Sequence, residues 1–461
     1  MKNLSRRKFI TRTSAAAAGA MIIPGLVGCG SGSGSKAKGS ATGKVNIAVI
    51  GVGGQGQQNW RDCMEENVVA LCDVSDTAAA EGFNTFPNAK RFKDFRVMFD
   101  KMANEIDAVI VATPDHTHFA AAMASMQLGK HICVEKPLAH NVWQLRTLQK
   151  AAKHYNVISQ MANQGHATVG IRYVKEWYEA GILGDVKEVF AWFNGPEFTP
   201  RGYFLKPDTY PPQEEPLPEG LDWDLWLGPV VPRPYSHFYI PRFWRGWYEL
   251  GNGELGDWAC HTLDAPFWSL DLGMPTSVDS VFKTPNTPEG YVCDQSILKF
   301  EFAGRGNKPP VTLNWFEGGL KPENRPEWGL PELPGSGMIM VGDKISLMTG
   351  GRPNDPKLLV PEEQWLEFQK NMPAETIPRV EGGPRAEWLR AIKGEGPMPG
   401  SNFDYSSRLT EMAAIGVMAQ RFDTRIEYDA ANMKVTNHPE FDVVIKEPVR
   451  DGWSYGEDLW T

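Results

Sequence analysis

Short apolar runs alternate with segments of helical periodicity through the first third of the chain. The apolar runs, each predicted as a strand, are residues 45–50, 68–72, 108–112, 131–134 and 157–160. Helices are predicted after residue 56, at 95–103, in a segment ending at 128, and at 141–155. Strands that are apolar on both faces belong to parallel sheets covered on both sides, and regular alternation with helices implies right-handed crossovers. The pattern predicts a doubly wound α/β domain over residues 44–162.

A different pattern follows over residues 163–461. A helix is predicted at 171–179, and later segments with helical periodicity lie at 388–392 and 409–419. Apolar or alternating segments of strand length recur at 186–193, 278–282, 295–302, 311–316 and 337–341. Alternating apolar and polar residues are typical of an antiparallel sheet with one covered face. This part of the chain is therefore predicted as an α+β domain.

Residues 195–252 interrupt this pattern with a long stretch rich in proline and aromatic residues. Its aromatic residues include Trp223, Trp226, Tyr235, Phe238, Tyr239, Phe243, Trp244, Trp247 and Tyr248, with Arg233, Arg242 and Arg245 among them. Long ordered loops are often functional lids, and aromatic faces can pack against the C–H surfaces of sugars. We expect most of these aromatic residues to pack the loop against the domain and one or two to line a cleft.

The first 43 residues indicate targeting rather than fold. Residues 5–10 (SRRKFI) match a twin-arginine export signal, and an apolar run at 15–27 leads to a lipobox-like end at Cys29. The alternatives are an uncleaved anchor or a chance arginine pair. We expect residues 1–29 to be the export signal, residues 30–43 to be a flexible linker, and the mature protein to be periplasmic and anchored to the membrane only by a lipid on Cys29.

Net charge and cysteine spacing argue against a nucleic acid partner and against a cysteine-based zinc or redox site. The formal net charge is −9, and the chain after residue 29 holds 42 basic and 56 acidic residues, a net charge of −14. An acidic body argues against a nucleic acid partner. None of the six cysteines has the C-x-x-C spacing of a zinc or redox pair, and Cys72 and Cys133 lie in predicted strands, where we expect buried thiols.

The first strand leads directly into a glycine-rich turn. Gly51, Gly53, Gly54, Gln55 and Gly56 belong to a G-x-G-x-x-G run at the end of the strand, where glycines allow a tight turn and close approach to a pyrophosphate. Asp73 ends the second strand, 22 residues after Gly51. A carboxylate there can accept hydrogen bonds from ribose hydroxyls and repels a 2′-phosphate, which favours NAD over NADP; the alternative is that Asp73 caps the next segment.

Further polar residues follow the other predicted strands, at the edge where parallel sheets bind ligands. They are Thr113, Pro114, His116, His118, Glu135, Lys136, Asn163 and Gln164. We expect these residues to contact the cofactor. For His116 and His118 we prefer backbone contacts and helix capping to metal ligation, because no set of acidic and histidine ligands is apparent. Asn163 and Gln164 either contact nicotinamide or substrate or form a polar turn.

Two motifs resemble those of the Gfo/Idh/MocA oxidoreductases. Residues 135–137 (EKP) follow a strand, and residues 253–264 (GELGDWACHTLD) contain Asp257 and His261 in an Asp-x-x-x-His pattern. The resemblance implies a Rossmann domain followed by a substrate-binding and oligomerisation domain with a large open, mostly antiparallel sheet. It also implies that His261 is the catalytic base, Asp257 orients the substrate, and Lys136, commonly aimed by a cis Lys-Pro bond, lies between substrate and nicotinamide. On a helix Asp257 and His261 share one face.

The resemblance implies hydride transfer from a sugar, glycoside or polyol to NAD, with oxidation at C3 of a glycoside as one option and a homo-oligomer as the expected assembly. Two alternatives are an NAD-dependent glycosidase that uses transient oxidation and a non-catalytic sugar-binding lipoprotein. The twin-arginine route carries folded cargo, so we also expect the dinucleotide to be acquired before export and to stay bound.

Overall fold

The computed structural model describes residues 43–461. The predicted export signal, the lipid-bearing Cys29 and nearly all of the predicted linker lie outside these residues. Within the described range, no helix combines the length and the apolar character that crossing a bilayer requires.

The first domain is a six-stranded parallel sheet, as the apolar runs predicted. Its strands are β1 (Asn46–Ile50), β2 (Asn67–Cys72), β3 (Lys90–Phe92), β4 (Ala108–Val111), β5 (His131–Val134) and β6 (Ser159–Met161). Their order is β3-β2-β1-β4-β5-β6, the doubly wound arrangement of dinucleotide-binding domains. Only β3 was not predicted: it is a short strand of mostly charged residues at the sheet edge, where a solvated strand needs no apolar run.

Helices cover both faces of this sheet. They are α2 (Gln55–Arg61), α3 (Asp76–Thr85), α4 (Phe95–Met102), α5 (Asp115–Gln127) and α6 (Val142–His154). Side-chain caps set several of their starts: Ser75 accepts from the backbone N–H of Ala78, and Asn141 accepts from that of Gln144. Almost every residue of α5 is buried, because other parts of the chain cover its outer side.

The second domain contains a nine-stranded sheet. The strands are β7 (Val186–Trp192), β8 (Ser277–Lys283), β9 (Ser296–Phe302), β10 (Val311–Glu317), β11 (Gly337–Gly342), β12 (Leu347–Thr349), β13 (Lys357–Leu358), β14 (Ile426–Asp429) and β15 (Lys434–Val435). Neighbouring strands are antiparallel except for β7 and β10. On β9 and β10 every second residue is buried, which is the alternation that the sequence predicted.

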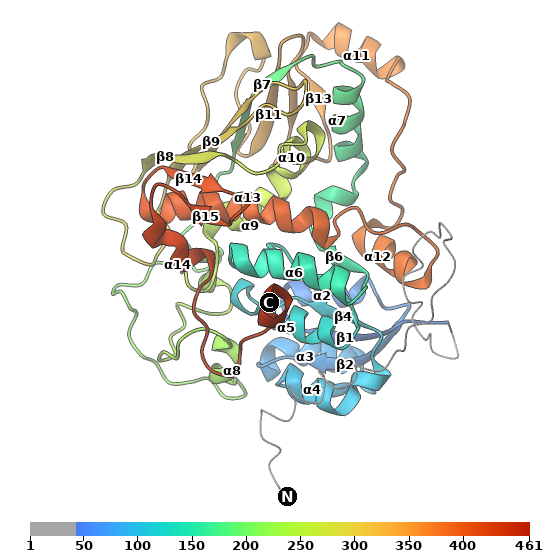
Figure 1. Cartoon of the computed structure of the whole chain (residues 1–461), viewed down its shortest axis with the longest axis vertical. Coiled ribbons are helices and arrows are strands. Elements are labelled where there is room, and N and C mark those ends of the chain that lie inside the picture. Colours follow the sequence, from blue (N-terminus) through green and yellow to red (C-terminus); the bar gives the residue numbers. More distant parts are fainter. Residues whose placement is uncertain (1–42) are drawn as a thin grey trace, which may run out of the picture.

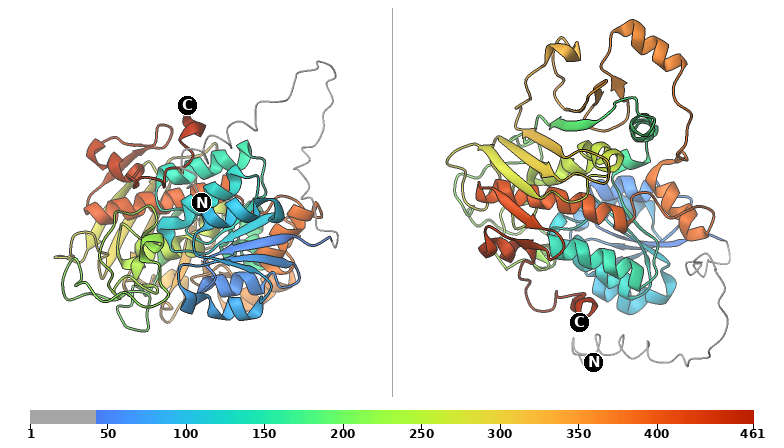
Figure 2. Two further views of the ribbon diagram at one scale, coloured as in Figure 1. Left: turned by 90° about the horizontal axis from the view of Figure 1, so that it is seen from below. Right: turned by 45° about the horizontal axis from the view of Figure 1, so that its top comes forward.

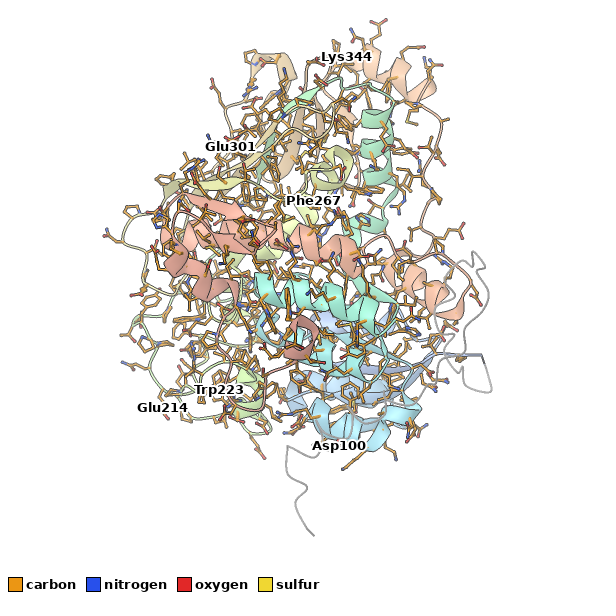
Figure 3. The ribbon with its side chains drawn as sticks, viewed as in Figure 1. Asp100, Glu214, Trp223, Phe267, Glu301 and Lys344 are labelled. Carbon is orange, nitrogen blue, oxygen red and sulfur yellow. The ribbon has the colours of Figure 1, made fainter. Side chains whose placement is uncertain are left out.

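Helices cover one face of this sheet. They are α7 (Val169–Glu179), α9 (Gly253–Thr262), α10 (Asp264–Leu270) and α13 (Phe403–Phe422). Figure 3 shows Phe267 of α10 inside the molecule, whereas Asp100 and Lys344 lie on its outside. Part of the second face is covered by the segment at 318–335, whose buried Trp328 packs edge-on against Phe190 of β7 with ring centroids 5.8 Å apart. The short helices α11 (Glu362–Lys370) and α14 (Asp442–Ile445) lie outside the sheet.

Later parts of the chain return to the first domain. Helix α12 (Gly383–Lys393) buries Trp388 in one apolar cluster with Ile47 and Val49 of β1, and α13 packs against α6 between the two sheets (Figures 1 and 2). The last residues, 446–461, run over α4, α5 and α6, where Trp460 stacks on Trp143. The second domain therefore packs against both faces of the first domain's sheet, through α12 on one face and through α13, which packs on α6, on the other.

The proline-rich segment at 195–252 is mostly irregular, apart from α8 (Trp223–Leu227) and a short 3-10 turn. As predicted, most of its aromatic residues are packing residues. Those buried are Phe204, Trp226, Tyr235, Tyr239, Phe243, Trp244, Trp247 and Tyr248. Stacking of Trp223 on Trp226, with ring centroids 4.6 Å apart, shows how a segment without regular structure is held by ring contacts.

Candidate active site

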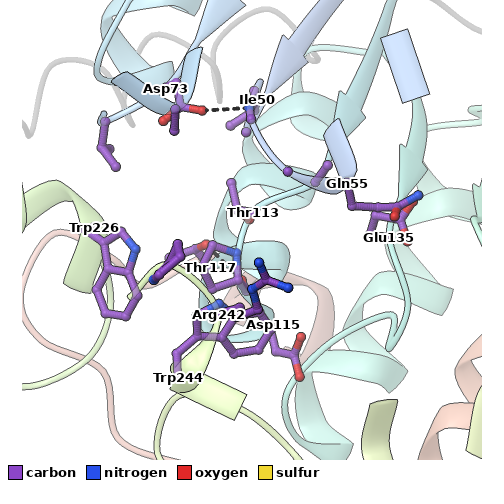
Figure 4. A pocket seen from close by; sticks show the side chains of 18 of the residues that line it. Ile50, Gln55, Asp73, Thr113, Asp115, Thr117, Glu135, Trp226, Arg242 and Trp244 are labelled. Atoms are coloured by element: carbon purple, nitrogen blue, oxygen red, sulfur yellow. Dashed lines mark hydrogen bonds between the residues drawn. The ribbon is translucent and has the colours of Figure 1, made fainter. Parts of the chain in front are cut away.

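A cavity of about 580 Å³ lies at the carboxyl ends of β1, β2, β4 and β5, between the first domain, α9 and the segment at 195–252. In Figure 4, Asp73 and Ile50 stand at one side of the cavity, and Trp226 and Trp244 lie across it. Ligands of doubly wound sheets bind at this edge. The predicted site residues that line the cavity are Gly51, Gly53, Gly54, Gln55, Asp73, Thr113, Pro114, Glu135, Lys136, Gln164, Asp257 and His261.

The glycine-rich turn can accept no side chains at three of its positions. A Cβ on Gly51, which has a φ of 84°, would lie 2.6 Å from the backbone of Ala112, and one on Gly56 would lie 2.0 Å from the carbonyl oxygen of Gly51. A Cβ on Gly53 would lie 2.7 Å from the Ala78 carbonyl. Gly54 has a φ of 53° and faces open space, so the turn offers bare backbone to the cavity. This cradle fits a pyrophosphate, although Gly56 itself is a packing residue that does not line the cavity.

Asp73 stands where the motif predicted. One carboxylate oxygen accepts from the backbone N–H groups of Val52 at 2.8 Å and Gly53 at 3.2 Å, and the other accepts from the N–H of Ser75 at 2.9 Å. Burial raises the pKa of Asp73, and these three hydrogen bonds oppose the rise. The carboxylate lines the cavity and ties the glycine turn to the end of β2. It therefore both shapes the cradle and can accept from a ribose hydroxyl.

Residues 113–118 divide into two groups. Thr113 and Pro114 line the cavity, and the buried Oγ1 of Thr113 has no hydrogen-bond partner within residues 43–461. His116 and His118 do not line it: the ring nitrogens of His116 contact the carbonyls of Leu250 and Trp226, and those of His118 contact the carbonyls of Pro137 and Thr113. The histidines therefore make the expected backbone contacts, but they join segments of the chain around the cavity.

Glu135 lines the cavity and belongs to a buried polar cluster. Its carboxylate accepts from Asn59 Nδ2 at 2.9 Å and from Arg385 Nη2 at 3.2 Å. Arg385 also donates to the Asn59 side chain and, at 3.1 Å, to the sulfur of Cys133. Because Arg385 belongs to α12, the second domain helps to orient the strand end that carries Lys136.

Lys136 and Asp257 form the charged centre of the site. Lys136 Nζ donates to Asp257 Oδ1 at 2.8 Å and to the Asp257 carbonyl at 3.0 Å, and Arg245 Nε donates to the same Oδ1 at 3.0 Å. Burial alone would raise the pKa of Asp257, but the two cations outweigh it and hold the pKa below its ordinary value. The Lys136–Pro137 peptide bond is cis. A lysine amine is thus held at the cavity wall by an ionised carboxylate.

His261 lies one helical turn after Asp257 on α9, and both line the cavity. Its buried Nδ1 has no hydrogen-bond partner among the described residues. Burial, followed by the positive charges of Lys136 and Arg352, holds the pKa of His261 well below its ordinary value. The imidazole is therefore neutral near pH 7 and free to accept a proton.

Asn163 and Gln164 separate in the structure. Gln164 lines the cavity, whereas Asn163 turns into the core, where its Nδ2 donates to Asp264 at 2.9 Å and its Oδ1 accepts from Ser401. His166 Nδ1 and the hydroxyl of Tyr405 contact the same Asp264 carboxylate. Asn163 therefore belongs to a buried polar cluster that joins β6 to α10 and α13.

Several lining residues were not assigned by the sequence, among them Asp115, Trp258, Arg352 and Trp453. Asp115 begins α5, and burial raises its pKa to about 6, against the lowering effect of Arg245. The Arg352 guanidinium lies 4.9 Å from the ring centroid of Trp258. The ring centroids of Trp258 and His261 are 5.4 Å apart. Among residues 43–461, no three His, Cys, Asp or Glu side chains gather as a metal site would require.

Comparisons with known proteins agree with this geometry. Residues 45–163 match a family model described as an oxidoreductase family, NAD-binding Rossmann fold, and residues 169–286 match the family's C-terminal alpha/beta domain. Levoglucosan dehydrogenase of Pseudarthrobacter phenanthrenivorans is 27% identical over 249 residues, which are 53% of each chain. A glycosyl hydrolase family 109 protein of Solibacter usitatus is 29% identical over 168 residues, 33% of this chain and 37% of that protein. The chain thus spans about half the length of these relatives or less.

A solved inositol dehydrogenase homologue from Azotobacter vinelandii, complexed with NADH and myo-inositol, has the same fold. Its TM-score is 0.55 at 15% sequence identity, over 84% of this chain and 98% of that chain. The two family models together cover slightly more than half of the 461 residues, in the order in which the structure places the two domains. The chain belongs to the Gfo/Idh/MocA family of oxidoreductases.

Proposed function

We propose that this protein is an NAD-dependent oxidoreductase that takes a hydride from a carbinol carbon of a sugar, glycoside or polyol. One observation carries the proposal: Lys136 and His261, 125 positions apart in the chain, line the same cavity as the glycine-rich turn and Asp73. A nicotinamide cofactor supplies the hydride acceptor when bound, and the protein supplies positioning and a base.

The residues divide the work of the reaction. His261, neutral and with an unpartnered nitrogen, accepts the hydroxyl proton as the carbinol is oxidised. Lys136, held by Asp257, donates a hydrogen bond to the reacting oxygen. Asp257 accepts hydrogen bonds from the Lys136 amine and the Arg245 guanidinium at one oxygen, Oδ1. Its other oxygen, Oδ2, can accept a hydrogen bond from a neighbouring substrate hydroxyl.

The finer assignment is a glycoside oxidised at C3. What supports a sugar ring as the substrate is that the aromatic residues Tyr203, Trp244 and Trp258 line the cavity, because aromatic faces suit the C–H surface of a sugar ring. The similarity to levoglucosan dehydrogenase, whose name states a sugar substrate, points in the same direction.

A panel of glycosides, free sugars and inositols tests the proposal, with NAD present and the products identified by mass spectrometry. A keto-sugar formed from a glycoside supports it, and C3 is read from the product. Binding of the panel without any turnover would refute the enzymatic proposal in favour of a sugar-binding protein.

The second candidate is a glycosidase that oxidises its substrate transiently. The similarity to the glycosyl hydrolase family 109 protein favours it. In the same panel it would release the aglycone without a net change in the amount of NAD, and without a keto-sugar. The intact Glu135-Lys136-Pro137 motif, in which this chain resembles the dehydrogenases of the family, weighs toward the dehydrogenase.

We further propose that the protein is exported by the twin-arginine route, carries a lipid on Cys29 at the periplasmic face of the membrane, and assembles as a homo-oligomer. The residues SRRKFI and the apolar run before Cys29 support the first two points. Mass measurement of the mature N-terminus and light scattering of the protein without its leader test them.

A further inference from the structure

A short segment of the proline-rich loop crosses one end of the cavity. We call residues 220–230, which include α8, the strap. The backbone N–H of Asp222 donates to the Val74 carbonyl at 2.9 Å, and the carbonyl of Gly220 accepts from the N–H of Asp76 at 3.2 Å and from Lys93 Nζ at 2.8 Å. Two of these hydrogen bonds fasten the strap to the residues that lead from β2 into α3, and the third fastens it to Lys93, the residue after β3.

The strap crosses the end of the cavity that suits adenosine. Leu221 forms an antiparallel bridge with Ser75, two residues after Asp73, and the carboxylate at the end of β2 is the group that faces the adenosine ribose in this fold. Leu221, Leu225 and Trp226 of the strap line the cavity there. In Figure 4, Trp226 lies across the cavity from Ile50 and Gln55.

The C-terminal segment, residues 446–461, holds the strap from outside. Arg450 donates to the carbonyl of Gly228, donates at 2.6 Å to the carbonyl of Asp224, and pairs with the Asp224 carboxylate. The Arg450 side chain is 17% exposed. Figure 1 shows this segment passing beside α8 before it ends over α5.

Two further contacts complete the enclosure. Trp453 of the C-terminal segment lines the cavity and packs edge-on against Phe95, with ring centroids 6.0 Å apart. On the inner side, His116 Nε2 lies 2.9 Å from the Trp226 carbonyl. The strap is thus attached to the β2 loop, to α5 and to the chain's last residues, all three of which border the adenosine end.

We propose that the strap and the C-terminal segment enclose the adenosine half of bound NAD, so that the dinucleotide stays on the protein from one turnover to the next. The inference rests on the proposed function for the identity of the ligand. Its physical basis is that the dinucleotide leaves only when the strap lifts, and lifting breaks the backbone hydrogen bonds of the strap together with the partly buried hydrogen bond from Arg450 to the Gly228 carbonyl.

Exchange of bound NAD measures this directly. The protein is loaded with isotope-labelled NAD and mixed with an excess of unlabelled NAD, and native mass spectrometry follows the labelled fraction. The wild type should keep its label over many turnover times. Arg450→Met should release it about tenfold faster or more, because the hydrogen bonds from Arg450 to the strap carbonyls of Gly228 and Asp224 are lost. Arg425→Met is the control: Arg425 is likewise held by an ion pair, with Asp279 and with Glu427, but does not line the cavity.

A reversible cross-link gives a second test that does not depend on removing a contact. Cα atoms of directly opposed residues in an antiparallel pair lie roughly 4.5–5.5 Å apart, within the span of a disulfide, so Ser75→Cys with Leu221→Cys can lock the strap. The oxidised form should release NAD more slowly than the reduced form and should fail to load when prepared empty.

Three outcomes overturn the inference: exchange by the wild type within one turnover time, an unchanged rate in Arg450→Met, or equal rates in the oxidised and reduced cross-link variant. A protein that binds no NAD at all would instead refute the proposed function. Fast exchange with intact NAD binding would leave that function standing and remove only the role of the strap.

Discussion

Asp257→Asn removes the one full negative charge between Lys136 and Arg245 while it keeps the shape of the side chain. The side chains of Lys136, Arg245 and Asp257 are 15%, 17% and 10% exposed, so solvent screens their interaction only weakly. Removing one partner of a buried ion pair costs about 3–5 kcal/mol. The asparagine oxygen still accepts a hydrogen bond, so we expect a loss near the lower end, about 3 kcal/mol.

Urea unfolding followed by tryptophan fluorescence gives the free energy of unfolding. The matched control is Asp404→Asn, because Asp404 pairs with Lys153 where the two side chains are 50% and 65% exposed; we expect about 1 kcal/mol or less there. An equal loss in the two variants would show that Lys136, Arg245 and Asp257 do not form a buried charged centre.

The pH dependence of the loss in unfolding free energy caused by Asp257→Asn provides an independent check. The folded-state pKa of Asp257 is lowered, so its contribution to stability is fully present above the unfolded-state pKa of about 3.9 and is lost as the pH falls toward the lower folded-state value. The difference between wild type and Asp257→Asn should therefore shrink below about pH 4. A difference that grows on acidification would contradict the assigned charge state.

Three further variants test other parts of the site. His261→Ala should lower turnover by about 10²–10⁴-fold and leave NAD affinity unchanged in a fluorescence titration; retained turnover would remove the base from its role. Arg352→Gln removes a positive charge that lowers the pKa of His261, so the acid limb of the kcat/KM profile should move to higher pH, and an unmoved limb would exclude the interaction. Asp73→Ala should weaken NAD by about tenfold, through the loss of hydrogen bonds to a charged group, and affect NADP less; an unchanged ratio of the two affinities would count against a ribose contact.

Periodicity predicted the parallel sheet and most of the second domain because those elements bury apolar residues at regular intervals. It missed the short strands β3, β12 and β14 and the two-residue strands β13 and β15, which are too short or too polar for a period to show. The packing of α12 against β1 also lay beyond a local pattern, because it joins residues more than 300 positions apart.

For the site as well, the sequence predicted some features and could not predict others. A strand end predicts that a residue lies at the ligand-binding edge, but it does not predict the direction of its side chain: Thr113 faces the cavity, whereas His116 and Asn163 turn into packed contacts. Arg245 could not be selected among the arginines of the irregular loop, because its role follows from a contact with Asp257 that only the folded chain creates. Asp115 follows a strand as a helix-capping aspartate would, and only its burial distinguishes it.

Transfer of deuterium from a glycoside labelled at the reacting carbon tests the central claim most directly. If Lys136 and His261 hold the carbinol against bound nicotinamide, one deuterium should appear on the dinucleotide for each keto-sugar formed in a single turnover, and His261→Ala should form neither. A keto-sugar produced while the dinucleotide stays unlabelled, or no oxidation of any sugar by protein with bound NAD, would contradict the account.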